Sequence, residues 1–386
     1  MDKRTEIALI YSNSKKWIAG AYYIQNIVHA INTLSDEKKP KINLYSSEQD
    51  YYDLCAITKY PYIEHHILEE GLIFKKCNIF LTKIYKFLCP YSYKYFGGLN
   101  IFNSNNVLVY PCINYTLIKT DTKLIAWIAD LQEKHLPDLF DKKELAYRES
   151  KIRMFVKNKL PIVFSSKDSE NDFKKFYPNS TNKTFILRFA VTHPDFSGLN
   201  IHAIKEKHGI NGEYMFCANQ FWVHKNHLFL FRVFKKYLDQ GHDMQLVCTG
   251  ELFDFRDKTY AASIRAFIKD NSLEDRIKII GFVDREEQLC LMDNSYAIIQ
   301  PSLFEGWSTV VEDAKALNKF IFLSNLNVHK EQDPCNVSFF DPYDEIDLLN
   351  KLNTVKQSRI YHDYSQNIRD FGENFLDIIN YISLQK

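Results

Sequence analysis

Three observations predict an α/β protein with two domains. Short apolar runs alternate with amphipathic helical runs along the chain, which is typical of parallel sheets with helices on both faces. The length of 386 residues favours two hydrophobic cores over one. Pro, Gly and polar residues collect at residues 191–198, and the alternation starts again after them. That composition makes this segment the predicted linker.

The first domain is expected to span residues 1–192. Apolar residues 7–11 predict its first strand, residues 12–20 a loop, and residues 21–34 an amphipathic helix. Further strands of the same sheet are predicted at residues 41–45, 107–110, 124–128, 162–164 and 184–189.

The second domain is expected to span residues 193–359. Its predicted strands are residues 214–217, 244–248, 277–280 and 296–299, and its predicted helices include residues 227–238 and 258–269. The last stretch, residues 360–386, has a helical pattern with no strand after it.

Composition narrows the class of protein. The formal net charge is +1, from 49 basic and 48 acidic residues, which excludes a general nucleic-acid binder. Eight scattered cysteines without a C-x-x-C pair predict buried, reduced thiols in a cytoplasmic protein. The N-terminal residues lead directly into a strand and do not form a signal peptide. No apolar run reaches the ~20 residues of a membrane span, so only peripheral membrane contact is expected.

The most informative stretch is residues 296–317, which predict a buried strand, a loop with one glycine, and a helix that opens at Ser308 or Thr309. This order places free backbone N–H groups and a positive helix end at the edge of a sheet. Glu305 lies before the helix and Asp313 lies one turn inside it. Amides suit a phosphate and carboxylates suit sugar hydroxyls, so the stretch indicates a nucleotide-sugar site.

This stretch resembles the E-x7-E signature of retaining family 4 glycosyltransferases, in which Glu305 is the first acid and Asp313 stands where the family usually has a second glutamate. Residues 306–308 stand where the family usually has Gly-Phe-Gly. The resemblance implies a GT-B fold, with two Rossmann-like domains facing across a cleft and a terminal helix that crosses back to the first domain. It also implies that Glu305 contacts the donor sugar and Asp313 the ribose. Gly306 and the backbone amides of Trp307, Ser308 and Thr309 would lie at the phosphate and sugar.

Residues 217–227 resemble the family's diphosphate-binding segment, which carries an arginine and a lysine six residues apart. Lys225 matches the lysine, whereas Asn219 stands where the arginine would be. A lysine can offset a diphosphate as a point charge. His224 and His227 have a spacing that could indicate a metal, but no third ligand is visible, and we expect His227 to cap or pack in the first helical turn.

Two further strand ends resemble parts of the family's nucleotide site. Gly250 follows a strand at the position of a glycine turn under the nucleotide, and Phe282 and Val283 match the segment along the base. An ordinary turn at a strand end explains either feature equally well.

In the first domain, Gly20 stands where the family often has a Gly-Gly pair that approaches the donor phosphate. Residues 127–140 resemble a family segment that follows a strand, with Asp130, Gln132 and His135 expected to face the cleft. His135 is the candidate to hold an acceptor hydroxyl or the donor sugar, and a packing histidine is the alternative. Residues 165–172 predict a helix start with a structural serine N-cap.

Residues 74–95 mix five lysines with seven aromatic residues. Such a segment can lie on an anionic membrane surface, which would suit a lipid-linked acceptor. A solvated helix face packed on the first domain explains the pattern equally well.

The resemblance therefore implies a retaining transferase that moves a hexose from a nucleotide sugar to a glycan or lipid-linked acceptor in bacterial O-antigen or capsule synthesis. The matching subset is mannosyltransferase-like. Glu305, His135 and Asp130 are the predicted catalytic residues. No D-x-D motif occurs, and neither a metal nor a cofactor is expected. The alternatives are a nucleotide-sugar 2-epimerase of the same fold and a non-catalytic sugar-nucleotide-binding protein.

Overall fold

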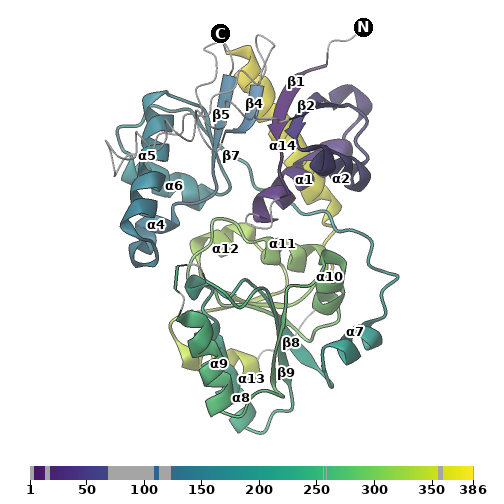
Figure 1. Cartoon of the computed structure of the whole chain (residues 1–386), viewed down its shortest axis with the longest axis vertical. Helices are drawn as coiled ribbons and strands as arrows, with labels where there is room; N and C mark the ends of the chain where they lie inside the picture. Colours follow the sequence, from purple (N-terminus) through teal and green to yellow (C-terminus); the bar gives the residue numbers. More distant parts are fainter. Residues whose placement is uncertain are drawn as a thin grey trace. The chain divides into compact units, whose positions relative to one another are not determined.

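The computed structural model describes residues 4–13, 18–67, 108–112, 123–254, 256–257, 259–354 and 360–385. The chain divides into two compact units. The first is Met1–Thr192 with Ser365–Lys386, and the second is His193–Tyr364. Each contains a parallel sheet with helices on both faces (Figure 1).

The sheet of the first unit has the strand order β3-β2-β1-β4-β5-β6-β7 in its described part. Its strands are β1 (Glu6–Ile10), β2 (Lys41–Ser46), β3 (Ile63–Ile67), β4 (Leu108–Cys112), β5 (Lys123–Ile128), β6 (Ile162–Phe164) and β7 (Thr184–Ile186). Strand β3 was not predicted. It pairs only with β2 among the described strands, and its Glu64, His65 and His66 give it no apolar run.

The helices of the first unit are α1 (Ile18–Asn32), α2 (Glu48–Thr58), α4 (Gln132–His135), α5 (Lys142–Lys157), α6 (Lys167–Phe176) and α14 (Ser365–Leu384). Phe155 of α5 and Phe173 of α6 belong to the core cluster that contains Ala126 and Ile128 of β5. The long terminal helix α14 packs on α1. There Gly372 lies so close to Ala30 that a Cβ atom would be 2.7 Å from the Ala30 carbonyl oxygen.

Helix α1 begins earlier than the sequence predicts. Ile18 is its first residue, so Gly20 lies in the first helical turn and not in a loop. The apolar residues Ile18 and Ala19 extend the helical pattern, and a glycine costs little where the first turn has no intrahelical N–H bonds to lose. Gly20 is therefore helical, contrary to the loop predicted for residues 12–20.

The sheet of the second unit has the order β10-β9-β8-β11-β12-β13. Its strands are β8 (Tyr214–Ala218), β9 (Gln245–Thr249), β10 (Ile277–Gly281), β11 (Ile298–Gln300), β12 (Ile321–Ser324) and β13 (Val337–Phe340). Its helices are α7 (Ile201–Lys207), α8 (His227–Asp239), α9 (Tyr260–Asp270), α10 (Arg285–Asp293), α11 (Thr309–Ala316), α12 (Asn327–Gln332) and α13 (Glu345–Thr354).

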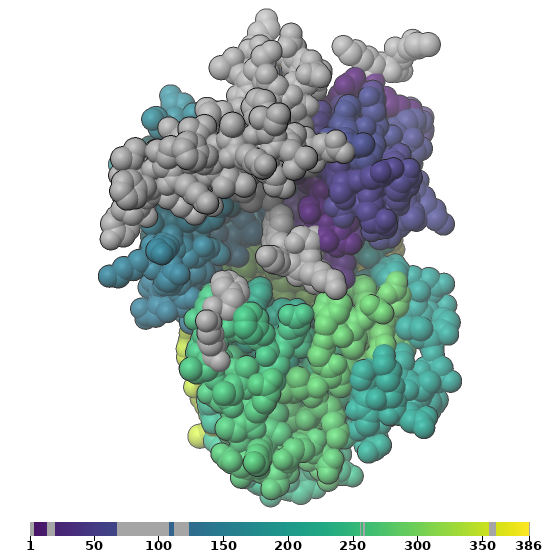
Figure 2. All heavy atoms as spheres, viewed as in Figure 1, coloured from purple at the N-terminus to yellow at the C-terminus, as the bar shows by residue number. Residues whose placement is uncertain are grey.

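Alternate residues of these strands pack in two hydrophobic cores, one on each face of the sheet. Met215 and Cys217 of β8 pack with residues of α8, α9 and α13. Tyr214 and Phe216 point to the other face, where α7, α10 and α11 supply the partners. Helix α7 is drawn in teal at the surface in Figure 2. This alternation is the period of two that a strand imposes, and it explains why continuous apolar runs predict strands covered on both sides.

Two sequence-based expectations concern the cysteines and the segment 74–95. Among the described cysteines, Cys217, Cys248 and Cys290 are buried as expected, whereas Cys335 is exposed. The segment 74–95, with its membrane interpretation, lies outside the described residues. Within the described part of the chain, no helix combines the length and apolar character needed to cross a bilayer.

Replacing Gly372 with alanine should destabilise the first unit. The added methyl group would meet the backbone of α1, which cannot move aside without shifting α14. We expect a loss of about 1–3 kcal/mol in the free energy of unfolding, measured by urea denaturation. The control is Asn374→Ala, an exposed position two residues further along α14. Equal stabilities of the two variants would contradict this packing of α14.

Candidate functional site

The carboxyl ends of β8 and β11 meet at the point where the strand order of the second sheet reverses. From β8 the chain builds the sheet outward through β9 and β10, and from β11 through β12 and β13 on the other side. In open α/β sheets, ligands bind outside the carboxyl ends of the strands at such a reversal. Asn219 follows β8 and Gln300 ends β11, so both lie at this position.

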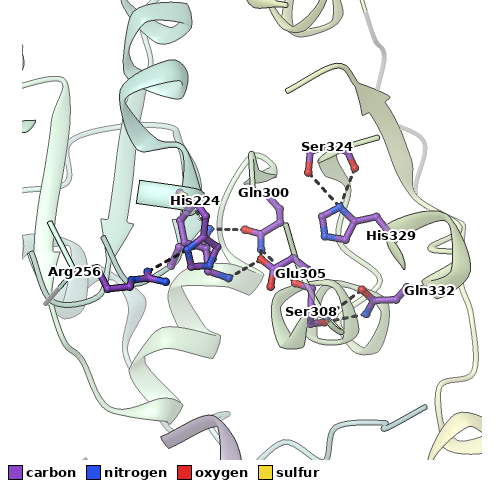
Figure 3. A network of polar contacts seen from close by, with 11 residues as sticks. His224, Arg256, Gln300, Glu305, Ser308, Ser324, His329 and Gln332 are labelled. Atoms are coloured by element: carbon purple, nitrogen blue, oxygen red, sulfur yellow. Dashed lines mark hydrogen bonds and ion pairs between the residues drawn. The ribbon is translucent and has the colours of Figure 1, made fainter. Parts of the chain in front are cut away.

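Gln300 is the centre of a buried polar network at this edge of the sheet (Figure 3). Its side chain is fully buried, and its oxygen accepts a hydrogen bond from the Asn219 side chain. Its nitrogen donates to Glu305 over 2.9 Å and to Ser308 Oγ over 3.2 Å. One amide therefore links both strands at the reversal to the loop that precedes α11.

Lys225 and Glu305 form an ion pair beside Gln300. Their Nζ and Oε1 atoms are 2.5 Å apart, and their side chains are 14% and 10% exposed. Lys225 ends a short 3-10 helix, Val223–Lys225, and the backbone N–H of Leu303 donates to the His224 carbonyl oxygen. The two loops that carry the pair are therefore joined directly. Sequence reasoning selected both residues separately, and the structure brings them together.

The start of α11 is held by a residue that sequence reasoning missed. Ser308 is the N-cap of α11, and its backbone N–H donates to the side-chain oxygen of Gln332 over 3.1 Å. The Gln332 nitrogen donates back to the Ser308 carbonyl oxygen and to Glu312. The Ser308 amide is thus engaged within the protein, contrary to the expectation that it is free for a phosphate. Gly306 is buried, and Trp307 and Thr309 are half-buried.

Asp313 is buried and engaged by two partners. Arg285 donates to both carboxylate oxygens, at 2.9 Å for the longer contact, and His193 Nε2 lies 2.9 Å from Oδ1. Burial opposes ionisation, but Arg285 and His193 outweigh it and hold the pKa of Asp313 below its usual value. The predicted ribose contact would require this carboxylate to exchange a partner.

Glu312, the neighbour of Asp313, is also buried. It accepts hydrogen bonds from Tyr364 Oη at 2.5 Å and from Gln332. Burial raises its pKa above the usual value, against the opposing effects of Lys315 and these hydrogen bonds. Glu312 therefore belongs to the interior of the second unit, whereas Glu305 lies nearer its surface.

The two histidines near Lys225 are packing residues. His224 is buried, and Arg256, which also pairs with Asp254, lies 3.2 Å from its Nδ1. Burial lowers the pKa of His224 well below its usual value. His227 is fully buried in the first turn of α8 and stacks on Phe221, as the sequence predicted for a packing role. No cluster of His, Cys, Asp and Glu with the arrangement of a metal site occurs among the described residues.

The remaining predicted donor residues lie at strand ends. Gly250 has a φ of +113°, and a Cβ atom there would lie 2.3 Å from the Asn219 carbonyl oxygen, so only glycine fits this close approach. Gly250 therefore allows the turn after β9 to lie against the backbone of Asn219. Phe282 is 55% exposed and Val283 is half-buried after β10.

In the first unit, the predicted residues after β5 are already partnered. Asp130 accepts a hydrogen bond from the backbone N–H of Gln132. The Gln132 residue itself is buried. His135 Nε2 lies 2.6 Å from Asp172 of α6. Glu133 is buried, and burial raises its pKa although Arg148 lies 3.4 Å away. The predicted N-cap of α6 is confirmed, because the Ser166 side chain accepts from the Ser169 N–H.

Comparison with known proteins shows that part of the chain is similar to a known family. Residues 200–373 match the family model "Glycosyl transferases group 1". The chain is also 23% identical over 268 residues to the O-antigen chain mannosyltransferase RfbU of Salmonella typhimurium. That alignment covers 69% of this chain and 70% of RfbU.

Solved structures show the same fold across the whole chain. A glycosyltransferase from Rickettsia africae has a TM-score of 0.59 at 13% identity, over 100% of this chain and 94% of that structure. HepE of Anabaena, in complex with UDP-glucose, has a TM-score of 0.55 at 13% identity, over 97% and 94% of the two chains. Together with the two Rossmann-like sheets, these likenesses establish the GT-B fold.

The charge on Asp313 should make the second unit sensitive to acid. Because its pKa is lowered, the ionised carboxylate stabilises the fold above its ordinary value of 3.8, and this stabilisation is lost as the pH falls through the lowered value. Asp313→Asn should cost about 3–5 kcal/mol at pH 7, because it removes the buried carboxylate that pairs with the partly buried Arg285.

Urea denaturation of the full chain at several pH values measures this difference. We expect the gap between wild type and Asp313→Asn to narrow below pH ~4. The control is Asp275→Asn, since the Asp275 side chain is fully exposed and its ion pair with Lys278 is screened by solvent. A gap that stays constant down to pH ~3 would contradict the assigned ion pair.

Proposed function

We propose that this chain transfers a hexose from a nucleotide sugar to a glycan or lipid-linked acceptor. The proposal starts from the match of residues 200–373 to the model "Glycosyl transferases group 1" and from the GT-B fold. The likeness to an O-antigen chain mannosyltransferase supports bacterial surface polysaccharide as the product class and mannose as the first sugar to test. The likeness to a structure that holds UDP-glucose makes UDP-hexoses the second set of donors to test.

The observation that carries this proposal is the Lys225–Glu305 pair at the strand reversal of the second sheet. A cation and a carboxylate at one strand edge match the two halves of a nucleotide sugar. Lys225 can offset charge on the diphosphate as it becomes the leaving group, and Glu305 can accept hydrogen bonds from the sugar hydroxyls. Without a donor, each group is neutralised by the other.

Because Asn219 stands where the family has an arginine, the proposed diphosphate site has one cation, Lys225, in place of two. The arginine implied by family resemblance is replaced by an amide that is 6% exposed and bound to Gln300. Lys225 then carries the electrostatic role at this edge of the sheet. We propose that transfer is metal-independent and retains the configuration at the anomeric carbon, as the family resemblance implies.

Two other functions predict different products from the same incubation. A nucleotide-sugar 2-epimerase would isomerise its donor without an acceptor, and a sugar-nucleotide-binding protein would leave the donor unchanged. Incubation of GDP-, UDP- and dTDP-hexoses with and without a lipid-linked glycan, followed by chromatography, separates these outcomes. Acceptor-dependent release of a nucleoside diphosphate, with label on the glycan, is the result we expect.

Glu305→Gln should abolish most of the transfer and leave the fold intact. The amide keeps the size of the side chain and can still accept from Gln300, but it loses the charge that strengthens hydrogen bonds to sugar hydroxyls. We expect turnover to fall at least about 100-fold. Circular dichroism and thermal unfolding check the fold, and turnover near that of wild type would refute the role of Glu305.

Lys225→Ala should weaken binding of the nucleoside diphosphate. The loss of one charged hydrogen-bonding partner corresponds to about 10- to 100-fold in affinity. Isothermal titration calorimetry with GDP and UDP measures it, and Lys330→Ala, an exposed lysine on α12, is the matched control. If both variants bind as wild type does, the diphosphate site lies elsewhere.

A further inference from the structure

His329 is a buried histidine that neither the family motifs nor the ion pair explain. It lies on α12, directly after β12, and its side chain is fully buried. Its Nδ1 atom lies 2.8 Å from the Ser324 carbonyl oxygen and 3.2 Å from Ser324 Oγ. A carbonyl oxygen can only accept, so Nδ1 carries the proton and donates it.

The second ring nitrogen is therefore an acceptor. Burial lowers the pKa of His329 to about 4, so the ring is neutral at physiological pH and Nε2 presents a lone pair. Among the residues that the structure describes, this atom has no hydrogen-bond partner, although it is shielded from solvent. A buried polar atom without a partner costs free energy, and ligand sites are among the places where that cost is offset.

Nε2 lies on the side of the ring that points toward Glu305. Figure 3 shows the His329 ring with Nδ1 toward Ser324 and its other nitrogen toward the network of Gln300, Glu305 and Ser308. The two charges of the pair act on the pKa of this ring in opposite directions, Glu305 raising it and Lys225 lowering it. The unpaired acceptor thus belongs to the same strand edge as the proposed donor site.

On the basis of the proposed function, we infer that His329 Nε2 accepts a hydrogen bond from a hydroxyl of the hexose carried by the donor. A lone pair repels phosphate oxygens, which bear no proton at neutral pH, and attracts O–H groups. The low basicity of the ring makes it a poor general base at neutral pH. His329 is thus a sugar-binding residue that helps to select the hexose and not the nucleotide.

Asparagine is the discriminating substitution at this position. His329→Asn places its amide N–H near the position of Nδ1, keeps the bond to Ser324 and loses the acceptor at Nε2. His329→Gln reaches further and can restore an acceptor near the position of Nε2. The two variants therefore separate the packing role of the ring from its role toward a sugar.

Calorimetry on the full chain provides the test, with GDP and GDP-mannose, and with UDP and UDP-glucose, as probe pairs. We expect His329→Asn to bind each diphosphate within about twofold of wild type, but to bind the accepted nucleotide sugar about tenfold more weakly. His329→Gln should recover part of that loss. Equal weakening of diphosphate and nucleotide sugar, or no weakening at all, would overturn the inference while leaving the proposed function intact.

Wild-type protein provides a second readout should the asparagine variant fail to fold. The nitrogen NMR shift of His329 Nε2 should change when the nucleotide sugar is added and stay unchanged with the diphosphate alone. An identical shift with both ligands would overturn the sugar contact. Wild-type protein that binds none of the GDP-, UDP- and dTDP-hexoses would overturn the proposed function together with this inference.

Discussion

The geometry of the candidate site depends on the hydrogen bond between Asn219 and Gln300, because it joins the two strands at which the second sheet reverses its order. Parallel strands bring their carboxyl ends to one edge, but they do not fix the loops that follow. A buried amide pair does so here, since an unpaired amide at this depth would be costly. Glu305 and Ser308 are then held by the same Gln300 side chain.

Much of this arrangement was predictable from the sequence. The strands of both sheets with continuous apolar runs, except β12, follow from local pattern, as do the start of α11 and the packing role of His227. Glu305 and Lys225 were found because a known motif surrounds each of them. The GT-B fold is confirmed by the structural likenesses and the two parallel sheets.

The parts that sequence reasoning missed depend on contacts between residues distant along the chain. The Gln332 side chain accepts a hydrogen bond at the start of α11, 24 residues earlier in the chain. Neither the residue type of Gln332 nor its distance along the sequence indicates this role. Asp313 matched a ribose-binding motif, whereas Arg285 and His193 occupy it in the fold. His329 was passed over because a single histidine carries no motif, and what distinguishes it is an unpaired Nε2 on the side of the ring toward Glu305. Tertiary partners, absent from any local pattern, decide each of these cases.

Helix α11 also holds both ends of the second unit. His193, the first residue of this unit, contacts Asp313, and Tyr364, its last residue, contacts Glu312. The two points where the polypeptide enters and leaves this part of the molecule are therefore anchored on consecutive carboxylates of one helix. A displacement of the chain at His193 or at Tyr364 would therefore act directly on α11, the helix whose first turn follows Glu305. Two side-chain contacts thus tie both ends of the second unit to the helix that follows Glu305.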